Sequence, residues 1–389
     1  MARRLFRRRM PRRVTCRWLL RGKKTSPPPH YSTPDYSSLP DEIQEQILLK
    51  LQCFKSIVTC TSVCKSWYVL IKSRGFITMH LSRPLSNAEY FLCSYSKRFC
   101  YSIRNYNSER LEGYHGLIFP ERRVTLHGSC NGLICYTKLD DVFSQIYLWN
   151  FTIRKLKILP KSKYFSQHTA YGFWYERNSD DYKVAKISCT EVFRVEVYSL
   201  SSNSWDLIAT SGPSYSKTFF DKVVHVNGTL YWLASDQIYW WRNRRIISLN
   251  MKDLMFRDTL VWHAEESRSV VTFDMLGAGG RVILLFSFYN SGTDHMGIHV
   301  YDENLNDLYR YESGSSEKEY FRPLGMRSSG NEVLFQKLGT DAPIVVFDAG
   351  DFKFKEFCSS TKTIFRAIPF VETLVLLDDG DSRSLPNAP

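Results

Sequence analysis

Residues 128–136 read GSCNGLICY, and residues 224–233 read VHVNGTLYWL. In each stretch an Asn-Gly pair separates two runs rich in apolar residues. This pattern is typical of a two-residue turn between antiparallel strands. Comparable turn signals precede apolar runs at Asp180-Asp181, Gly279-Gly280 and Gly330-Asn331. The sequence therefore predicts a series of hairpins along this part of the chain.

The predicted turns recur at a nearly constant interval. With Gly132, Asp181, Gly228, Gly280 and Gly330 as markers, the intervals are 49, 47, 52 and 50 residues. A second set of motifs, LWN, VYS, IIS, VYD and VFD ending at 150, 199, 248, 302 and 348, has intervals of 49, 49, 54 and 46. A unit near 50 residues with several short strands has the length of a kelch-like propeller blade, and a β-sandwich would lack such a period.

Two further segments extend the repeat toward both ends of the domain. Residues 81–105 form a partial unit, and ETLVLLD at 372–378 is the predicted last strand. We therefore predict an all-β domain over residues 82–380, as a six-bladed β-propeller whose closing blade is shared between the two ends. Residues 381–389 are assigned to a tail.

A helical pattern precedes the repeats, beginning with SSLPDEIQEQILLKL at residues 37–51. Pro40 suits a first helical turn, and Asp41 and Glu42 place negative charge at the positive end of the helix dipole. The spacing of Ile43, Ile47, Leu48 and Leu51, and then of Ile57, Cys60, Cys64, Trp67 and Ile71, is helical. Residues 38–81 are predicted to form two or three short helices. Because so small a unit is only marginally stable alone, it either docks on the following domain or is completed by a partner.

Both regions carry motifs that resemble a known family. Leu39-Pro40, the apolar positions through Leu51, VCKSW at 63–67 and Phe76 before His80-Leu81 resemble an F-box, particularly the plant type. Farther on, GSCNGLIC at 128–135, LWNFTIRKLKILP at 148–160, DDYKV at 180–184 and VYSLSSNSW at 197–205 resemble the F-box-associated domain of plant F-box/kelch-repeat proteins. The resemblance covers about residues 38–380.

The resemblance implies a role in ubiquitin ligation without catalysis by this chain. It implies that the F-box binds a Skp-type adaptor, and through it a cullin, while the propeller binds a target protein whose identity and binding residues the sequence leaves unknown. The alternative is an adaptor-binding scaffold or regulatory protein that does not direct ubiquitination. The candidate adaptor-binding residues are Leu39, Pro40, Ile43, Ile47, Leu48, Val63 and Trp67. Within this set, Leu39 and Pro40 favour the interface, whereas Val63 and Trp67 favour the core of the module.

The basic charge of the chain is concentrated in its first residues. The formal net charge is +13, and residues 1–24 contain nine arginines, two lysines and no acidic residue. The rest of the chain carries only +2, which argues against a general nucleic-acid surface. For this basic tail, which a Pro-rich linker extends to residue 37, three interpretations stay open: a solvated extension, a nuclear-localisation or nucleic-acid-binding patch, and a transit peptide.

No motif of an enzyme, a cofactor site or a metal site stands out. GAGG at 277–280 lacks the Lys-Ser/Thr of a phosphate loop and lies at a repeat turn. The ten cysteines form no Cys-x-x-Cys pair, and no apolar run approaches the roughly 18 residues needed to span a bilayer. Reduced thiols then predict a cytoplasmic or nuclear protein. YWWRNRR at 239–245 is a candidate target anchor, because Tyr, Trp and Arg dominate binding hot spots, but an extra-long blade connection is the favoured interpretation.

Overall fold

The computed structural model describes the chain from Leu39 to Ser384 with internal gaps. The described residues are 39–51, 53–82, 90–95, 100–105, 113–117, 119–121, 123–139, 145–164, 169–189, 193–210, 217–236, 243–263, 268–278, 280–290, 293–312, 320–326, 332–338, 343–348, 351, 353–358, 364–376 and 383–384. The predictions for the basic tail, the linker and the Gly330-Asn331 turn lie outside them. The chain divides into two compact units, residues 1–44 and 45–389.

Four short helices open the described chain. They are α1 (Asp41–Leu49), α2 (Phe54–Cys60), α3 (Lys65–Lys72) and α4 (Arg74–Leu81). The sequence predicted two or three, and the difference arises at Ser73, which interrupts the apolar stripe. Ser73 has an extended backbone (ψ 143°), and its hydroxyl accepts a hydrogen bond from the Phe76 N–H at 3.2 Å. A serine in this position ends one helix and caps the next.

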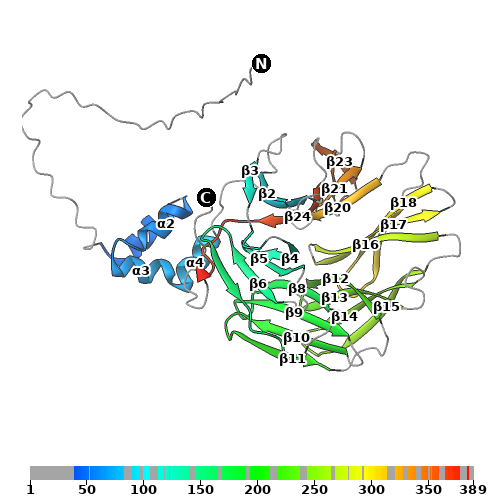
Figure 1. The fold of residues 1–389 in the computed structure, drawn as a ribbon, viewed down its shortest axis with the longest axis horizontal. Helices are drawn as coiled ribbons and strands as arrows, with labels where there is room; N and C mark the ends of the chain where they lie inside the picture. Colours follow the sequence, from blue (N-terminus) through cyan, green and yellow to red (C-terminus); the bar gives the residue numbers. More distant parts are fainter. Residues whose placement is uncertain are drawn as a thin grey trace, which may run out of the picture. The chain divides into compact units, whose positions relative to one another are not determined.

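All the remaining described elements are strands (Figure 1). The strands before the eight-stranded sheet are β1 (Tyr90–Tyr95), β2 (Cys100–Asn105), β3 (Gly113–Leu117), β4 (Val124–Cys130), β5 (Leu133–Lys138), β6 (Ile146–Asn150) and β7 (Lys155–Ile158). The eight-stranded sheet contains β8 (Thr169–Glu176), β9 (Asp181–Cys189), β10 (Phe193–Ser199), β11 (Ser204–Ala209), β12 (Lys217–Val226), β13 (Thr229–Asp236), β14 (Asn243–Asn250) and β15 (Phe256–His263). The strands after it are β16 (Arg268–Ala278), β17 (Arg281–Asn290), β18 (Thr293–Tyr301), β19 (Asp307–Glu312), β20 (Tyr320–Met326), β21 (Glu332–Leu338), β22 (Ile344–Asp348), β23 (Lys353–Cys358), β24 (Ile364–Phe370) and β25 (Arg383–Ser384).

The sheets close into a ring, which is the architecture of a propeller. In chain order β4, β8, β12, β16, β20 and β24 contact one another in succession, and β24 contacts β4 again. Closure comes from β24, which pairs antiparallel with β1 from Tyr90↔Phe370 to Tyr95↔Ile364. One sheet therefore contains strands from both ends of the domain, as the sequence predicted. A second sheet does so too, because β25 pairs with β7, although residues 381–389 were predicted to be a tail. The apolar core lies between the faces of neighbouring sheets, such as β12–β15 against β16–β19.

The number of sheets differs from the prediction of six blades. The described strands form five sheets, because β8 to β11 and β12 to β15 belong to a single eight-stranded sheet. They are joined where β8 and β12 pair in parallel at Tyr171↔Lys222. Gly172 permits this approach: a Cβ at Gly172 would lie 2.8 Å from the Val223 Cβ. Two four-stranded repeats of the sequence thus merge into one sheet.

The Asn-Gly turns have the geometry that the sequence predicted. Asn131 and Gly132 have φ values of 47° and 79°, and Asn227 and Gly228 have 46° and 78°. Positive φ at both central positions is the requirement of a type I′ hairpin. Gly132 joins β4 to β5 and Gly228 joins β12 to β13, so the two glycines hold equivalent places in their repeats, with β8 to β11 between them.

The turns between the third and fourth strands of the repeats also contain a left-handed residue, which the sequence did not reveal. Arg154, Asn203, Leu254 and Leu305 have φ values of 55°, 52°, 58° and 63°. They follow the ends of β6, β10, β14 and β18 by four residues. Only Asn203 is a residue type that favours this conformation, so the usual sequence signal for such a turn is missing from the others.

We expect Leu254→Asn to raise the free energy of unfolding by about 0.5–1 kcal/mol, because asparagine tolerates positive φ better than leucine. Leu254 is 44% exposed, so little apolar packing is lost. Urea denaturation measures the change. Leu308→Asn is the matched control, since Leu308 is equally exposed but lies on β19. An equal gain at both positions would refute the explanation by turn geometry.

The predicted strand over 372–378 is wrong for residues 372–376, the part of it that the structure describes. Strand β24 ends at Phe370, and residues 371–374 are irregular, with a turn at 375–376. The side-chain amide of Asn150 donates to the carbonyl oxygens of Thr373 (3.0 Å) and Val375 (2.7 Å). Because these carbonyls bond a side chain rather than a neighbouring strand, the segment is ordered without belonging to a sheet.

Candidate functional site

The candidate residues at the start of α1 lie in the first unit, of which residues 39–44 are described. Leu39 is half-buried, Pro40 is exposed and Ile43 is 47% exposed. The Pro40 carbonyl oxygen accepts the N–H groups of Ile43 (3.0 Å) and Gln44 (3.1 Å). The Gln44 side-chain amide donates to the Leu39 carbonyl at 2.7 Å. The Leu-Pro turn is therefore held by backbone and amide contacts, and the Pro40 and Ile43 side chains face solvent.

Apolar side chains are also exposed on the helices of the second unit and on the turn between α2 and α3. They are Ile47 (41%), Val63 (63%), Tyr68 (48%), Val69 (67%) and Met79 (40%). Single exposed apolar residues are common on protein surfaces, but several on one short helical module are typical of an interaction surface. The Lys72 ammonium donates to the Tyr68 hydroxyl at 3.0 Å, which restrains this ring.

The structure places two of the candidate residues, Leu48 and Val63, differently from the expectation, and Trp67 as expected. Leu48 is 0% exposed, so its side chain supports the core of the helices and cannot reach a partner in this conformation. Consecutive helical residues are rotated by about 100°, which turns Leu48 inward beside the exposed Ile47. Val63, expected in the module core, is exposed, whereas Trp67 is half-buried against that core. Sequence reasoning missed Tyr68 and Val69, for which the apolar stripe carried no signal.

The helices share a hydrophobic core with the propeller, all within the second unit. Of the two alternatives that the sequence left open, the structure shows docking on the following domain. The buried members of this core from the helices are Leu48, Leu49, Phe54, Ile57, Ile71, Phe76 and Ile77. Those from the propeller and the segment after β24 are Leu133, Tyr182, Leu374, Val375 and Leu376. Burial against the propeller supplies the apolar contacts that so small a module lacks alone.

Polar contacts surround this core at the β8–β9 turn. The Arg74 guanidinium of α4 lies 2.7 Å from the Asp180 carboxylate, which also accepts from the Tyr175 hydroxyl. The bond to Asp180 raises the pKa of Tyr175 to about 12. Burial raises the pKa of Asp181, but hydrogen bonds led by that from Ser199 hold it below its usual value. Both carboxylates are therefore engaged with protein groups.

A pocket of about 280 Å³ lies between α4 and this turn. Its walls include Arg74, Ile77, Asp180, Tyr182 and Val375. Arg74 and Asp180 pair with each other. This pair therefore does not indicate a catalytic or anion-binding role for the pocket. The pocket is a feature of the junction between helices and propeller, and we assign no ligand to it.

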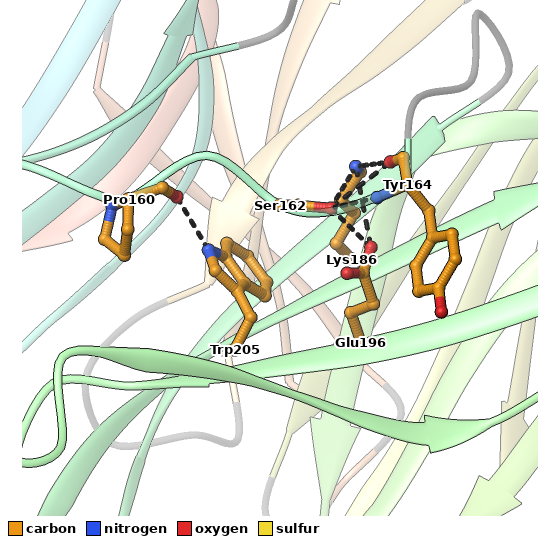
Figure 2. A network of polar contacts seen from close by, with 6 residues as sticks. All are labelled: Pro160, Ser162, Tyr164, Lys186, Glu196 and Trp205. Atoms are coloured by element: carbon orange, nitrogen blue, oxygen red, sulfur yellow. Dashed lines mark hydrogen bonds and ion pairs between the residues drawn. The ribbon is translucent and has the colours of Figure 1, made fainter.

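A second polar cluster lies in the propeller and requires a test for catalysis, since it contains a serine close to a lysine. The Lys186 ammonium donates to the Ser162 hydroxyl at 2.7 Å and to the Tyr164 carbonyl, and lies 3.6 Å from the Glu196 carboxylate (Figure 2). Ser162 in turn donates to Glu196 at 2.5 Å. A serine nucleophile would instead give its proton to a neutral lysine.

This cluster fits a structural role better. Lys186 and Glu196 are both buried, on β9 and β10. The segment after β7 covers them through Ser162 and Tyr164, and the Trp205 indole fixes the same segment by donating to the Pro160 carbonyl at 2.8 Å (Figure 2). The cluster therefore joins one repeat of the propeller to the next, and none of these contacts leaves a reactive group free.

The other candidates from the sequence also have structural roles. Of GAGG, Gly277 and Ala278 end β16 and Gly280 precedes β17, and a Cβ at Gly277 would lie 2.5 Å from a methyl carbon of Val224. Of YWWRNRR, the described residues 243–245 begin β14. There Arg244 is buried, and Arg245 pairs with Asp258 at 2.5 Å. Within the described ranges no three His, Cys, Asp or Glu side chains gather as metal ligands would, and no helix there has the length and apolar character of a membrane span.

Comparison with known families identifies both regions. Residues 36–81 match the F-box-like family, and residues 119–307 match the F-box associated beta propeller domain. The first match covers the four helices, and the second covers the propeller from β4 to the end of β18.

Curated relatives come from Arabidopsis thaliana. An F-box/kelch-repeat protein is 29% identical over 57% of this chain and 65% of its own length, and a second, putative F-box/kelch-repeat protein is 27% identical over 52% and 55%. F-box protein CPR1 is 27% identical over 90% of this chain and 91% of its own length. The chain thus spans less than two thirds of the first relative, but nearly all of CPR1.

Solved structures show only distant likeness. A chain of a nidogen/laminin complex has a TM-score of 0.48 and 10% identity, covering 73% of this chain and 99% of that chain. TolB from Acinetobacter baumannii has a TM-score of 0.47 and 10% identity, covering 76% and 70%. Likeness at this level supports no inference about what the chain binds.

Proposed function

Because this chain is a plant-type F-box protein, with an F-box-like module before an F-box associated beta propeller domain, we propose that it is the substrate-recognition subunit of a cullin-type ubiquitin ligase. F-box modules generally bind Skp-type adaptors, and proteins of this type are generally non-catalytic. In this proposal the helices bind the adaptor, and the propeller binds a target protein. Ubiquitin transfer is then accelerated because the target is held close to the ligase, at a high effective concentration.

The exposure of apolar side chains on the helical module carries the proposal. Val63 and Val69 are 63% and 67% exposed, although the module already has a buried core that it shares with the propeller. Folding of this chain therefore does not require these side chains. Short helices with unburied apolar side chains are suited to docking against a partner's hydrophobic surface.

The adaptor assignment predicts a specific loss of binding. We expect the double substitution Leu39→Ala and Pro40→Ala to weaken binding of a purified Skp-type adaptor by about 2–4 kcal/mol, since both act as anchors of the interface. Isothermal titration measures the affinity. Alanine at Leu260 and Leu308, two exposed leucines of the propeller, is the matched control. Undiminished adaptor binding by the folded Leu39/Pro40 variant would contradict the assignment.

A receptor and a scaffold differ in what happens to the bound protein. If the chain is a receptor, a protein that co-purifies with it is ubiquitinated by the reconstituted cullin ligase and accumulates in cells that lack the chain. If the chain is a scaffold that does not direct ubiquitination, the same protein co-purifies, but it is not ubiquitinated and it does not accumulate in cells that lack the chain. The two functions are thus separated by the fate of whichever protein co-purifies.

We propose that the basic tail determines location rather than adaptor binding, as a nuclear or nucleic-acid-binding element. Deleting residues 1–24 then shifts a fluorescent fusion out of the nucleus, or lowers its salt-sensitive retention, and leaves adaptor affinity unchanged. A variant with the lysines and arginines of the tail replaced by glutamine separates the effect of the tail's charge from the effect of its length. If mass measurement shows that the mature protein lacks the tail, a transit peptide is the correct interpretation instead.

A further inference from the structure

The segment after β24, residues 371–376, belongs to no sheet, yet its residues 373–376 are buried. Thr373 and Leu374 are each 1% exposed and Leu376 is 2% exposed. Buried irregular backbone requires hydrogen-bond partners, and this segment has them. Besides the two bonds from Asn150, the Thr373 N–H donates to the Thr152 hydroxyl (3.3 Å), and the Val375 N–H donates to the Thr373 hydroxyl (3.2 Å).

The contacts of this segment with the propeller leave no space for even a small side chain. A Cβ on Gly132 would overlap the Val371 carbonyl oxygen and lie 2.9 Å from the Thr373 Cβ. Asn150, which donates to Thr373 and Val375, is itself 0% exposed. The segment is thus held at the Gly132 turn and at the end of β6, on the repeat that follows the closing sheet.

The apolar side chains of the segment belong to the core of the helices. Leu374, Val375 and Leu376 lie in one cluster with residues of α1, α2, α3 and α4, including Phe54, Ile71 and Phe76. About three hundred residues of chain separate this segment from α4, yet it provides part of the hydrophobic core that a module of this size lacks.

We propose that residues 371–376 are a structural part of the adaptor-binding module, and that Asn150 and Leu374 are positioning residues that hold the helices on the propeller. Helices held in this way keep a bound adaptor at a constant distance and orientation from a bound target. Adaptor affinity then depends on residues at the far end of the chain, outside the part that matches an F-box. The expected effect on adaptor affinity rests on the proposed function, whereas the attachment of the helices to the propeller does not.

Hydrogen exchange on the full chain tests the structural claim. We expect Asn150→Ala and Leu374→Ala each to accelerate amide exchange in α2, α3 and α4 by on the order of tenfold, and to leave β16–β19 unchanged. Gln336→Ala is the matched control: this buried amide accepts the Ile364 N–H at 2.7 Å, at the start of β24. Unchanged helix exchange in both variants, or equal acceleration in the control, would overturn the proposal.

Adaptor titration of the same variants tests the functional consequence. We expect binding of a purified Skp-type adaptor to weaken by about threefold or more in Asn150→Ala and Leu374→Ala, and to be unchanged in Gln336→Ala. If the unmodified chain does not bind the adaptor, the proposed function fails while the exchange result still decides the structural claim. If Leu374→Ala unfolds the whole chain, Leu374→Val replaces it, because it removes one methylene and leaves most of the contact.

Discussion

Alanine at Gly132 is expected to lower the free energy of unfolding by about 2–5 kcal/mol, against about 1–2 kcal/mol for alanine at Gly228. The two glycines have φ values of 79° and 78°, so the backbone strain caused by a side chain is the same at both. The surroundings differ. No atom lies within 4 Å of a Cβ at Gly228, whereas a Cβ at Gly132 meets Val371 and Thr373.

The comparison of these two glycines isolates the steric cost from the conformational cost. Denaturant titration of both variants and the unmodified protein measures each loss. Asn131 and Asn227 precede the glycines and remain in place, so the turn type is matched. Equal losses at the two sites would show that residues 371–373 do not press on the Gly132 turn in solution, and that only the turn conformation matters.

The hairpin repeat was predictable because its signal is local. A type I′ turn requires positive φ at two successive residues, and Asn-Gly is among the few pairs that accept this readily. The Asn-Gly markers Gly132 and Gly228 therefore identified two-residue β-hairpin turns. The marker Asp181 instead follows a longer hairpin turn, in which Asp180 has positive φ (47°) and Glu176 pairs with Asp181. In the turns at Arg154 and Leu254 these two residues have the left-handed conformation, although neither is glycine or asparagine. The positions of these turns therefore depend on the strands around them and not on a local preference.

The fate of residues 372–378 was not predictable from their own composition. ETLVLLD has the apolar, β-branched character of a buried strand. Its outcome depends on Asn150, more than two hundred residues earlier, whose amide takes two carbonyls that a neighbouring strand would otherwise use. A side-chain contact between residues so far apart leaves no periodic pattern in the sequence.

Exposure on the helices was predicted only in part. Helical spacing gave one apolar stripe, and a stripe alone does not show which of its members face the propeller. Leu48 is buried in the shared core and Val63 is exposed because the propeller covers one side of the module. The helical period sets which residues share a face, and the position of the propeller decides which face stays exposed.

The second large effect concerns the buried pair of Lys186 and Glu196. We expect Lys186→Met to lower the free energy of unfolding by about 3–5 kcal/mol, because it leaves the Glu196 carboxylate buried without its cation. Glu196→Leu should be similarly damaging, since it leaves a buried ammonium. Chemical denaturation of each single variant measures the loss.

The double variant Lys186→Met with Glu196→Leu decides whether the pair itself stabilises the propeller. Burial lowers the pKa of Lys186, although the Glu196 carboxylate acts to raise it. In a buried ion pair the cost of removing water from both charges generally offsets most of their attraction. The double variant should therefore recover most of the stability lost in either single variant, to within about 1–2 kcal/mol of the unmodified protein. Additive losses in the double variant would instead show that the contacts of this pair with Ser162 and Tyr164 contribute a large net stabilisation, and that the join between neighbouring repeats depends on charge rather than on packing.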